Sequence, residues 1–380
     1  MSRSQRTIVH AVTVSRSLGF FRLFSSDLQD KGYEVISLSS PGPELEAHQS
    51  VGRKTIQVPM ERRMSPFKDL VSLFRLIRAF MKERPYVVHS MTPKVGMLCM
   101  LAAWLTRVPR RVHTFTGLVW PTATGMSRKI LMMTDWITCA CATHVIPEGK
   151  GVMDDLQTHI TKKPMKVLGY GNVRGVDMER FSLRPEIIES SAKIRKDGVF
   201  TFLFVGRIVR DKGINELVNA FQRLNLEFPD TRLLLVGAYE EKLDPISEEA
   251  HRVINENPKI QHVGVKRDDD LVAYYAASDC FVFPSYREGF PNTVMEAGAM
   301  GLPCIVTDIN GSREIIIDGK NGVIIPSKDE DALYQAMRDM LLEDDRYKEY
   351  KINARPLIES RFEKGFVKQC LLDFYKETLL

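Results

Sequence analysis

Short β-branched runs alternate with helical stretches along this chain, and the alternation stops once and then resumes. The strands expected before the interruption are Thr7–Val14, Tyr33–Leu38, Val87–Ser90, Arg111–Phe115, His144–Ile146 and Met165–Leu168. Those expected after it are Phe200–Val205, Arg232–Val236, Gln261–Val263, Cys280–Pro284, Pro303–Thr307 and Gly322–Ile325. With helical stretches such as Pro66–Lys82 and Ile214–Leu226 between them, this pattern is typical of parallel sheets covered on both faces.

The interruption lies near residues 172–195, where the glycine-rich segment Gly169–Gly175 leads into a polar stretch. Such a composition is typical of an interdomain linker. We therefore predict an α/β protein with two doubly wound, Rossmann-like domains, at residues 1–185 and 186–364. A C-terminal helix at about 365–380 is expected to pack back on the first domain. Ligands of such sheets bind at the carboxyl ends of the strands.

Composition and charge narrow the possible functions. The apolar runs are too short or too polar for a spanning helix of about 20 residues, and the sequence does not open on a signal-peptide pattern. The six cysteines form no Cys-x-x-Cys pair, which predicts reduced thiols. Residues 1–184 hold 27 Lys and Arg against 14 Asp and Glu, whereas the remainder is acidic. The first domain is therefore expected to meet an anionic partner, and no recognition motif points to nucleic acid.

The most informative string is Tyr286–Pro303, which follows an expected buried strand. It contains Glu288 and Glu296, with seven residues between them, and Asn292 as the expected N-cap of a helix. The N-terminus of that helix would bind an anion, and Gly289 would let a ligand approach the backbone closely. An alternative for Glu296 is that it only offsets the helix dipole in the first turn.

A second string supplies positive charge at the same sheet edge. Gly206 and Arg207 follow the strand Phe200–Val205, and Lys212 lies in the same loop. Both cations suit a diphosphate whose charge grows as it leaves, although they would also be ordinary as solvated loop residues. The acidic run Asp268–Asp270 precedes an expected helix, so we interpret it as a cap and predict no metal site there.

These strings, with Gly298, Gly301 and Pro303, resemble the donor domain of the retaining glycosyltransferases of family 4. That family has the GT-B architecture, two Rossmann-like domains facing a central cleft. The resemblance implies that Arg207 and Lys212 bind the donor diphosphate, that Glu288 contacts the transferred sugar and that Glu296 binds the ribose. The other donor-binding residues that it implies are Gly206, Val263, Gly264, Val265, Gly289, Phe290, Pro291, Asn292 and Thr293.

The first domain resembles the bacterial subgroup of this family that builds polysaccharide repeat units on a lipid diphosphate carrier, through strings such as His89–Gly96 and His113–Gly117. Many members carry a catalytic histidine at the position of Thr116, whereas this chain has His113 three residues earlier. The role is therefore expected at His113 or Thr116, with a purely structural His113 as the alternative. The resemblance also makes Arg16, Gly19 and Lys94 candidates for binding the acceptor.

The resemblance implies transfer of a hexose or N-acetylhexosamine from a nucleotide diphosphate sugar, most simply a UDP-sugar, to a glycan on polyprenyl diphosphate. Configuration would be retained by front-face substitution, with no protein nucleophile, no cofactor and no metal. Two alternatives remain at this point: a nucleotide-sugar epimerase of the same architecture, which would need a carboxylate and histidine set around His89 and His113, and a non-catalytic nucleotide-sugar-binding protein.

The stretch Met60–Arg84 alternates cations with apolar residues at helical spacing. The apolar residues are Phe67, Leu70, Leu73, Phe74, Ile77 and Phe80. Such a helix can lie on an anionic bilayer, and each nearby cation adds about 1 kcal/mol of attraction. We therefore predict a cytoplasmic enzyme held peripherally on the inner membrane. The alternative is a helix whose apolar stripe packs on the sheet.

Overall fold

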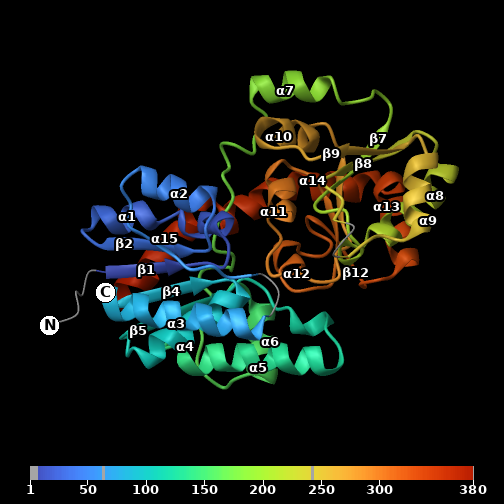
Figure 1. The fold of residues 1–380 in the computed structure, drawn as a ribbon. Coiled ribbons are helices and arrows are strands. Elements are labelled where there is room, and N and C mark those ends of the chain that lie inside the picture. Colours follow the sequence, from blue (N-terminus) through green and yellow to red (C-terminus); the bar gives the residue numbers. More distant parts are fainter. Residues whose placement is uncertain (1–6, 62–64, 241–243, 380) are drawn as a thin grey trace. The chain divides into compact units, whose positions relative to one another are not determined.

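The computed structural model describes residues 7–61, 65–240 and 244–379. The chain divides into two compact units, Met1–Gly175 with Gly365–Leu380, and Val176–Lys364 (Figure 1). The division falls ten residues before the boundary expected at residue 185. The second unit begins at Val176 because this residue pairs with the end of that unit. Its backbone N–H donates to the carbonyl oxygen of Phe362 at 2.8 Å, and its own carbonyl oxygen accepts from the N–H of Lys364 at 3.0 Å. The segment expected as a linker also contains a helix, α7 (Pro185–Ala192).

The first unit contains a six-stranded parallel sheet in the order β3-β2-β1-β4-β5-β6. Its strands are β1 (Thr7–Ala11), β2 (Glu34–Ser39), β3 (Thr55–Gln57), β4 (Val87–Met91), β5 (Arg110–Phe115) and β6 (His144–Pro147). The strand expected at Met165–Leu168 is absent, since that segment is irregular in the structure. The sixth place is taken at the other end of the sheet by β3, an edge strand of three partly exposed residues.

Helices cover both faces of this first sheet (Figure 1). They are α1 (Ser25–Asp30), α2 (Pro43–Ser50), α3 (Pro66–Glu83), α4 (Pro93–Leu105), α5 (Gly125–Cys141), α6 (Lys150–His159) and α15 (Lys364–Phe374). Alternate strand residues point to opposite faces. Val9 of β1 accordingly packs with α3–α6, and its neighbour Ile8 packs with α1, α2 and α15.

The second unit repeats the architecture, with the sheet order β12-β11-β10-β7-β8-β9. The strands are β7 (Phe200–Val205), β8 (Thr231–Val236), β9 (Ile260–Gly264), β10 (Cys280–Phe283), β11 (Cys304–Thr307) and β12 (Gly322–Ile325). The helices that matter below are α8 (Ile214–Glu227), α9 (Glu248–Glu256), α10 (Asp268–Ala276), α11 (Asn292–Ala299), α13 (Glu330–Leu342) and α14 (Asp344–Phe362). All strand pairs of both sheets are parallel, which confirms the predicted α/β class with two doubly wound sheets.

Within the described ranges, no helix combines the length and the apolar character that a membrane span requires. The same residues contain no group of three or more His, Cys, Asp or Glu side chains placed to hold a metal ion. All six cysteines are free thiols, and five of them are buried.

Candidate functional site

Lys212 and Glu288 form an ion pair at the carboxyl ends of the strands in the second unit. Lys212 follows β7 and Glu288 follows β10, two strands that are neighbours in the sheet. From β7 the chain proceeds to one edge of the sheet, and from β10 it proceeds to the other, so these two loops flank the topological switch point. Ligands of doubly wound sheets bind at this point. The two strings that the sequence singled out therefore meet where a ligand site is expected.

Close packing of the two loops holds the Lys212–Glu288 pair. Gly213 has φ +69°, and a Cβ there would lie 2.1 Å from the carbonyl oxygen of Pro284, so only glycine allows this approach. Ser285 Oγ donates a hydrogen bond to Glu288 Oε1 at 3.0 Å. The Lys212 ammonium also lies 5.3 Å from the ring centre of Phe283. Both partners of the pair are mostly buried, so the charges are fixed in position before any ligand arrives.

Further contacts between the same loops and the start of α8 involve residues to which the sequence assigned no individual role. The Arg287 guanidinium donates to Asp211 Oδ2 at 2.7 Å and 3.0 Å, and the Tyr286 hydroxyl donates to Glu216 at 2.6 Å. Burial and the nearby Glu216 raise the pKa of Tyr286, so this hydroxyl keeps its proton. These pairs brace the loop that carries Glu288. In the sequence, the one feature that could have pointed to Asp211 is its position directly before Lys212.

Arg207 lies apart from the Lys212–Glu288 pair in its contacts. Its guanidinium donates to Glu240 Oε2 at 2.7 Å, and its side chain is 51% exposed. Gly206, just before it, bonds through its N–H to Val236 of β8 at 2.9 Å. Arg207 therefore lies at the carboxyl ends of the strands, as predicted. It is paired with the Glu240 carboxylate, which a bound anion would have to replace.

Helix α11 begins one residue earlier than a cap at Asn292 requires. Asn292 is the first helical residue, and the cap position belongs to Pro291, which makes no side-chain cap hydrogen bond. The N-cap prediction for Asn292 is therefore wrong. Thr293 follows in the first turn and is half-buried.

Glu296 lies beyond the first turn of α11, which contains no acidic residue. The interpretation that it offsets the dipole from that turn is therefore wrong too. Its carboxylate instead accepts a hydrogen bond from the buried Tyr275 hydroxyl at 3.1 Å. Burial, with the adjacent Glu296 carboxylate, raises the pKa of Tyr275 well above its usual value. Tyr275 is thus a fixed donor that orients Glu296.

The other residues implied for donor binding differ in how far they are exposed to solvent. The Phe290 ring is buried and packs against Phe362 at 5.3 Å, so it belongs to the core of the unit. Gly289 is half-buried, and Pro291 is buried. The remaining three residues end or follow β9: Val263 and Gly264 are half-buried, and Val265 is 55% exposed.

The acidic run Asp268–Asp270 forms the first turn of α10 rather than preceding it. No side chain caps this helix, so the expected capping contact is wrong, but acidic residues in a first turn do offset the helix dipole. Asp268 pairs with Arg180 at 3.4 Å and Asp269 pairs with Arg184 at 2.6 Å. The run is thus part of a surface ion-pair network of the second unit.

In the first unit, His113 is buried, with 1% of its surface exposed. Its ring lies under Gly96 of α4, where a Cβ would come within 2.4 Å of the ring, and its Nδ1 lies 2.8 Å from Ser90 Oγ. Burial lowers the pKa of His113 to about 3, so the ring is neutral. This burial favours the structural alternative for His113. Thr116, just beyond β5, is half-buried and therefore more accessible.

The residues implied for acceptor binding lie near the carboxyl ends of β1 and β4. Arg16 and Gly19 are exposed on the turn Ser15–Phe21 that follows β1. Lys94 is the second residue of α4, which follows β4, and its ammonium pairs with Asp69 of α3 at 2.6 Å. Strands β1 and β4 are neighbours and flank the switch point of this sheet. The first unit thus has a candidate site of its own.

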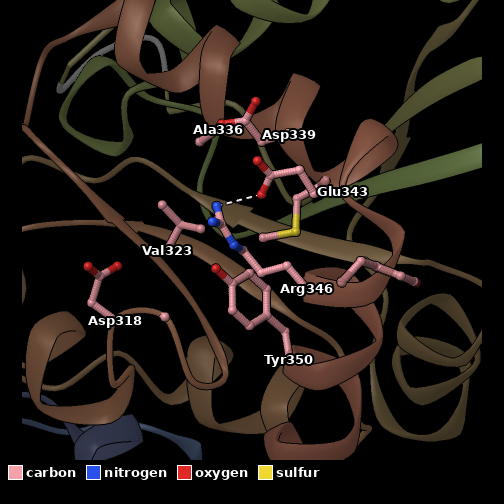
Figure 2. A pocket seen from close by; sticks show the side chains of 10 residues that line it. Asp318, Val323, Ala336, Asp339, Glu343, Arg346 and Tyr350 are labelled. Atoms are coloured by element: carbon pink, nitrogen blue, oxygen red, sulfur yellow. Dashed lines mark ion pairs between the residues drawn. The ribbon is translucent and has the colours of Figure 1, made fainter.

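A separate pocket of about 440 Å³ lies at the other end of the second sheet (Figure 2). It is lined by Asp318, which precedes β12, and by Asp339, Glu343, Arg346 and Tyr350 of α13, α14 and the turn between them. Arg346 pairs with Glu343 at 2.5 Å. Its place at the amino end of β12 separates it from the Lys212–Glu288 pair.

Comparison with known proteins agrees with this architecture. The family described as "Glycosyl transferase 4-like domain" matches residues 21–171, and the one described as "Glycosyl transferases group 1" matches residues 186–356. The capsular polysaccharide biosynthesis glycosyltransferase CapM of Staphylococcus aureus is 31% identical over 374 residues, which are 98% of this chain and 97% of that protein. The UDP-Gal:alpha-D-GlcNAc-diphosphoundecaprenol alpha-1,3-galactosyltransferase of Escherichia coli is 30% identical over 73% of this chain and 71% of that protein.

Solved structures share the fold at lower identity. Sucrose-phosphate synthase from Thermosynechococcus elongatus superposes with a TM-score of 0.79 at 20% identity, covering 98% of this chain and 99% of that one. Anabaena HepE, solved in complex with UDP, superposes with a TM-score of 0.78 at 16% identity, covering 97% and 99%.

Two Rossmann-like sheets, one in each unit, define the GT-B architecture. The chain belongs to glycosyltransferase family 4, among the enzymes of bacterial polysaccharide biosynthesis. It is a glycosyltransferase of the capsular or lipid-linked polysaccharide type.

Proposed function

We propose that this enzyme moves a hexose or N-acetylhexosamine from a UDP-sugar to a glycan on polyprenyl diphosphate, with retention at the anomeric carbon. The observation that carries the proposal is the Lys212–Glu288 pair at the switch point of the second sheet. Support for the substrates comes from the names of relatives: the Escherichia coli enzyme is named for UDP-Gal and a diphosphoundecaprenol acceptor, and HepE was solved with UDP.

In the proposed reaction, the bond from the sugar C1 to the β-phosphate oxygen breaks while an acceptor hydroxyl bonds to C1 on the same face. The hydroxyl proton passes to the departing phosphate oxygen. Lys212 stabilises the charge that grows on the diphosphate, and preorganised charges of this kind are usually the largest catalytic contribution. Glu288, held by Lys212 and Ser285, accepts hydrogen bonds from the sugar.

The nucleotide is proposed to bind beside this pair. Glu296, oriented by Tyr275, accepts from the ribose hydroxyls, and Arg207 exchanges Glu240 for a phosphate. Lys212, Arg207 and the N–H groups at the start of α11 then neutralise the diphosphate together. We therefore propose that catalysis needs no divalent metal. Undiminished activity in EDTA supports this, and activity lost in EDTA and restored by magnesium or manganese contradicts it.

The proposal extends to the membrane surface. On α3, Phe67 is 87% exposed, and Leu70, Val71, Phe74 and Met81 are exposed beside the cations Lys68, Arg75 and Arg78. Only the inner part of the expected stripe, Phe80 with the half-buried Leu73 and Ile77, packs inward. An exposed apolar and basic helix suits peripheral attachment to the anionic cytoplasmic face of the inner membrane. Arg62 and Arg63, also expected to contribute, lie outside the described residues.

The epimerase alternative finds no support in the first unit. Its candidate residues, His89 and His113, are both buried. The two ring nitrogens of His89 are hydrogen-bonded to the hydroxyls of Tyr375 and Thr114.

The test is to incubate the enzyme with a panel of UDP-sugars, with and without a polyprenyl-diphosphate-linked sugar, and to analyse products by mass spectrometry. Acceptor-dependent gain of one sugar supports the proposal. Conversion of a UDP-sugar without acceptor, or binding without any product, contradicts it.

A further inference from the structure

The first unit contains an apolar groove of about 630 Å³, a size typical of small-molecule sites. Its walls come from α3, α4 and α5, through residues such as Leu70, Leu73, Met97, Leu101, Ile130 and Met133. Helices α3 and α5 both pack against α4 (Figure 1). The groove is therefore a feature of the helical layer on one face of the first sheet.

One end of the groove reaches the switch point of this sheet. Thr13, just after β1, and Thr92, just after β4, line it, and their hydroxyls lie 2.8 Å apart. Thr92 has φ +85°, a conformation that is strained for a β-branched residue and that concentrates at functional sites. The Lys94–Asp69 pair is also part of this lining. Most of the polar groups of this groove are thus gathered at its end near β1 and β4, and the rest of its lining is largely apolar.

The groove also opens among exposed apolar side chains. Leu70 and Met133 line it and are 51% and 53% exposed. On α3, Leu70 lies in an exposed apolar stripe with Phe67 and Phe74. On α5, Met133 lies in a similar stripe with Met126 and Trp136. Cations flank the lining, since Arg16 precedes Ser17 and Lys129 precedes Ile130. Apolar walls with positive charge beside them suit an amphiphile that has an apolar chain and an anionic head.

We propose that this groove binds the isoprenoid chain of the acceptor, at the isoprene units next to the diphosphate. The proposal rests on the proposed function, which supplies a polyprenyl diphosphate as the carrier. The chain would run from the exposed apolar faces of α3 and α5 toward Thr13, Thr92 and Lys94, which places the diphosphate at the carboxyl ends of β1 and β4. Burying each further methylene stabilises such a complex, so affinity should rise with chain length until the groove is full.

The test measures binding by calorimetry with inorganic diphosphate, geranyl diphosphate and farnesyl diphosphate, below their micelle concentrations. Affinity should rise at least tenfold from inorganic to farnesyl diphosphate. The double variant Leu70→Asp, Met133→Asp should abolish this rise. Val51→Asp, an equally radical change at an exposed residue of the same unit, should preserve it. Because UDP is proposed to bind the other unit, an unchanged circular dichroism spectrum and melting temperature, rather than UDP affinity, would show that the double variant is folded.

Equal affinity for all three probes, or a rise that survives the double variant, overturns the groove proposal. If the groove is instead a contact between two copies of the chain, the double variant will change the molecular mass in solution and leave farnesyl diphosphate affinity intact. Failure of the proposed function is a separate result, because the enzyme would then transfer no sugar to polyprenyl-diphosphate acceptors of any chain length.

Discussion

Lys212 and Glu288 are 76 residues apart in the sequence, yet they form an ion pair between the loops that follow β7 and β10. In the proposed function, a donor diphosphate that draws Lys212 toward itself would also free the Glu288 carboxylate for the sugar. This coupling makes the pair, rather than either residue alone, the centre of the proposed site.

Glu288→Gln should lower kcat by about 100-fold or more with little change in melting temperature, because a charged contact to the reacting sugar is lost. Initial rates with an authentic acceptor give the measurement. Glu227→Gln is the matched control, since Glu227 of α8 pairs with Arg338 of α13, away from the Lys212–Glu288 loops. Near-wild-type turnover of Glu288→Gln would remove it from the site.

Lys212→Ala should weaken UDP binding and lower turnover, and Arg207→Ala should have a smaller effect because Arg207 is exposed and already paired with Glu240. Calorimetry with UDP measures both. Arg223→Ala, which loses an ion pair on α8 to Asp331, is the control. Affinity for UDP that stays unchanged in Lys212→Ala would contradict a role in holding the diphosphate.

The sequence was sufficient to predict the fold and the two strings that carry the candidate site. Runs such as Phe200–Val205 coincide with strands because β-branched and aromatic residues buried on both faces leave a clear local signal. The contact between Lys212 and Glu288 depends on β7 lying beside β10, which is a long-range property of the sheet. Local spacing alone does not encode it.

Other predictions were wrong or incomplete because the local sequence pattern fits more than one structure. Met165–Leu168 is apolar enough for a strand but finds no neighbour to pair with in the sheet. Asn292 looked like a cap, whereas Pro291 occupies that position. Helical spacing on α3 is the same whether the stripe packs inward or faces out, so the exposure of Phe67 and Phe74 required the structure.

Glu296→Ala should raise the Kd for UDP several-fold because the proposed ribose contact is lost. Tyr275→Phe removes only the hydrogen bond that orients Glu296, so it should cause a smaller loss of affinity. Calorimetry with UDP is to be read together with melting temperature. If Glu296→Ala lowers the melting temperature and leaves UDP affinity unchanged, the residue is structural.

The wild-type enzyme should sediment with vesicles that contain anionic lipid, and salt should weaken the binding because screened charges attract less. Making Arg75 and Arg78 neutral should weaken it further, since both are exposed on α3. Neutral vesicles are the control. Failure to bind anionic vesicles at low salt would contradict the membrane proposal and leave the transfer proposal standing.

The central claim is that this chain transfers a sugar from a UDP-sugar to a lipid-diphosphate-linked acceptor with retention. The most direct measurement is proton NMR of the product formed from an α-linked UDP-hexose or UDP-N-acetylhexosamine of gluco or galacto configuration. The account predicts an α-linked product, seen as a small H1–H2 coupling, that forms only when the acceptor is present. A β-linked product, or a changed sugar without acceptor, would contradict it.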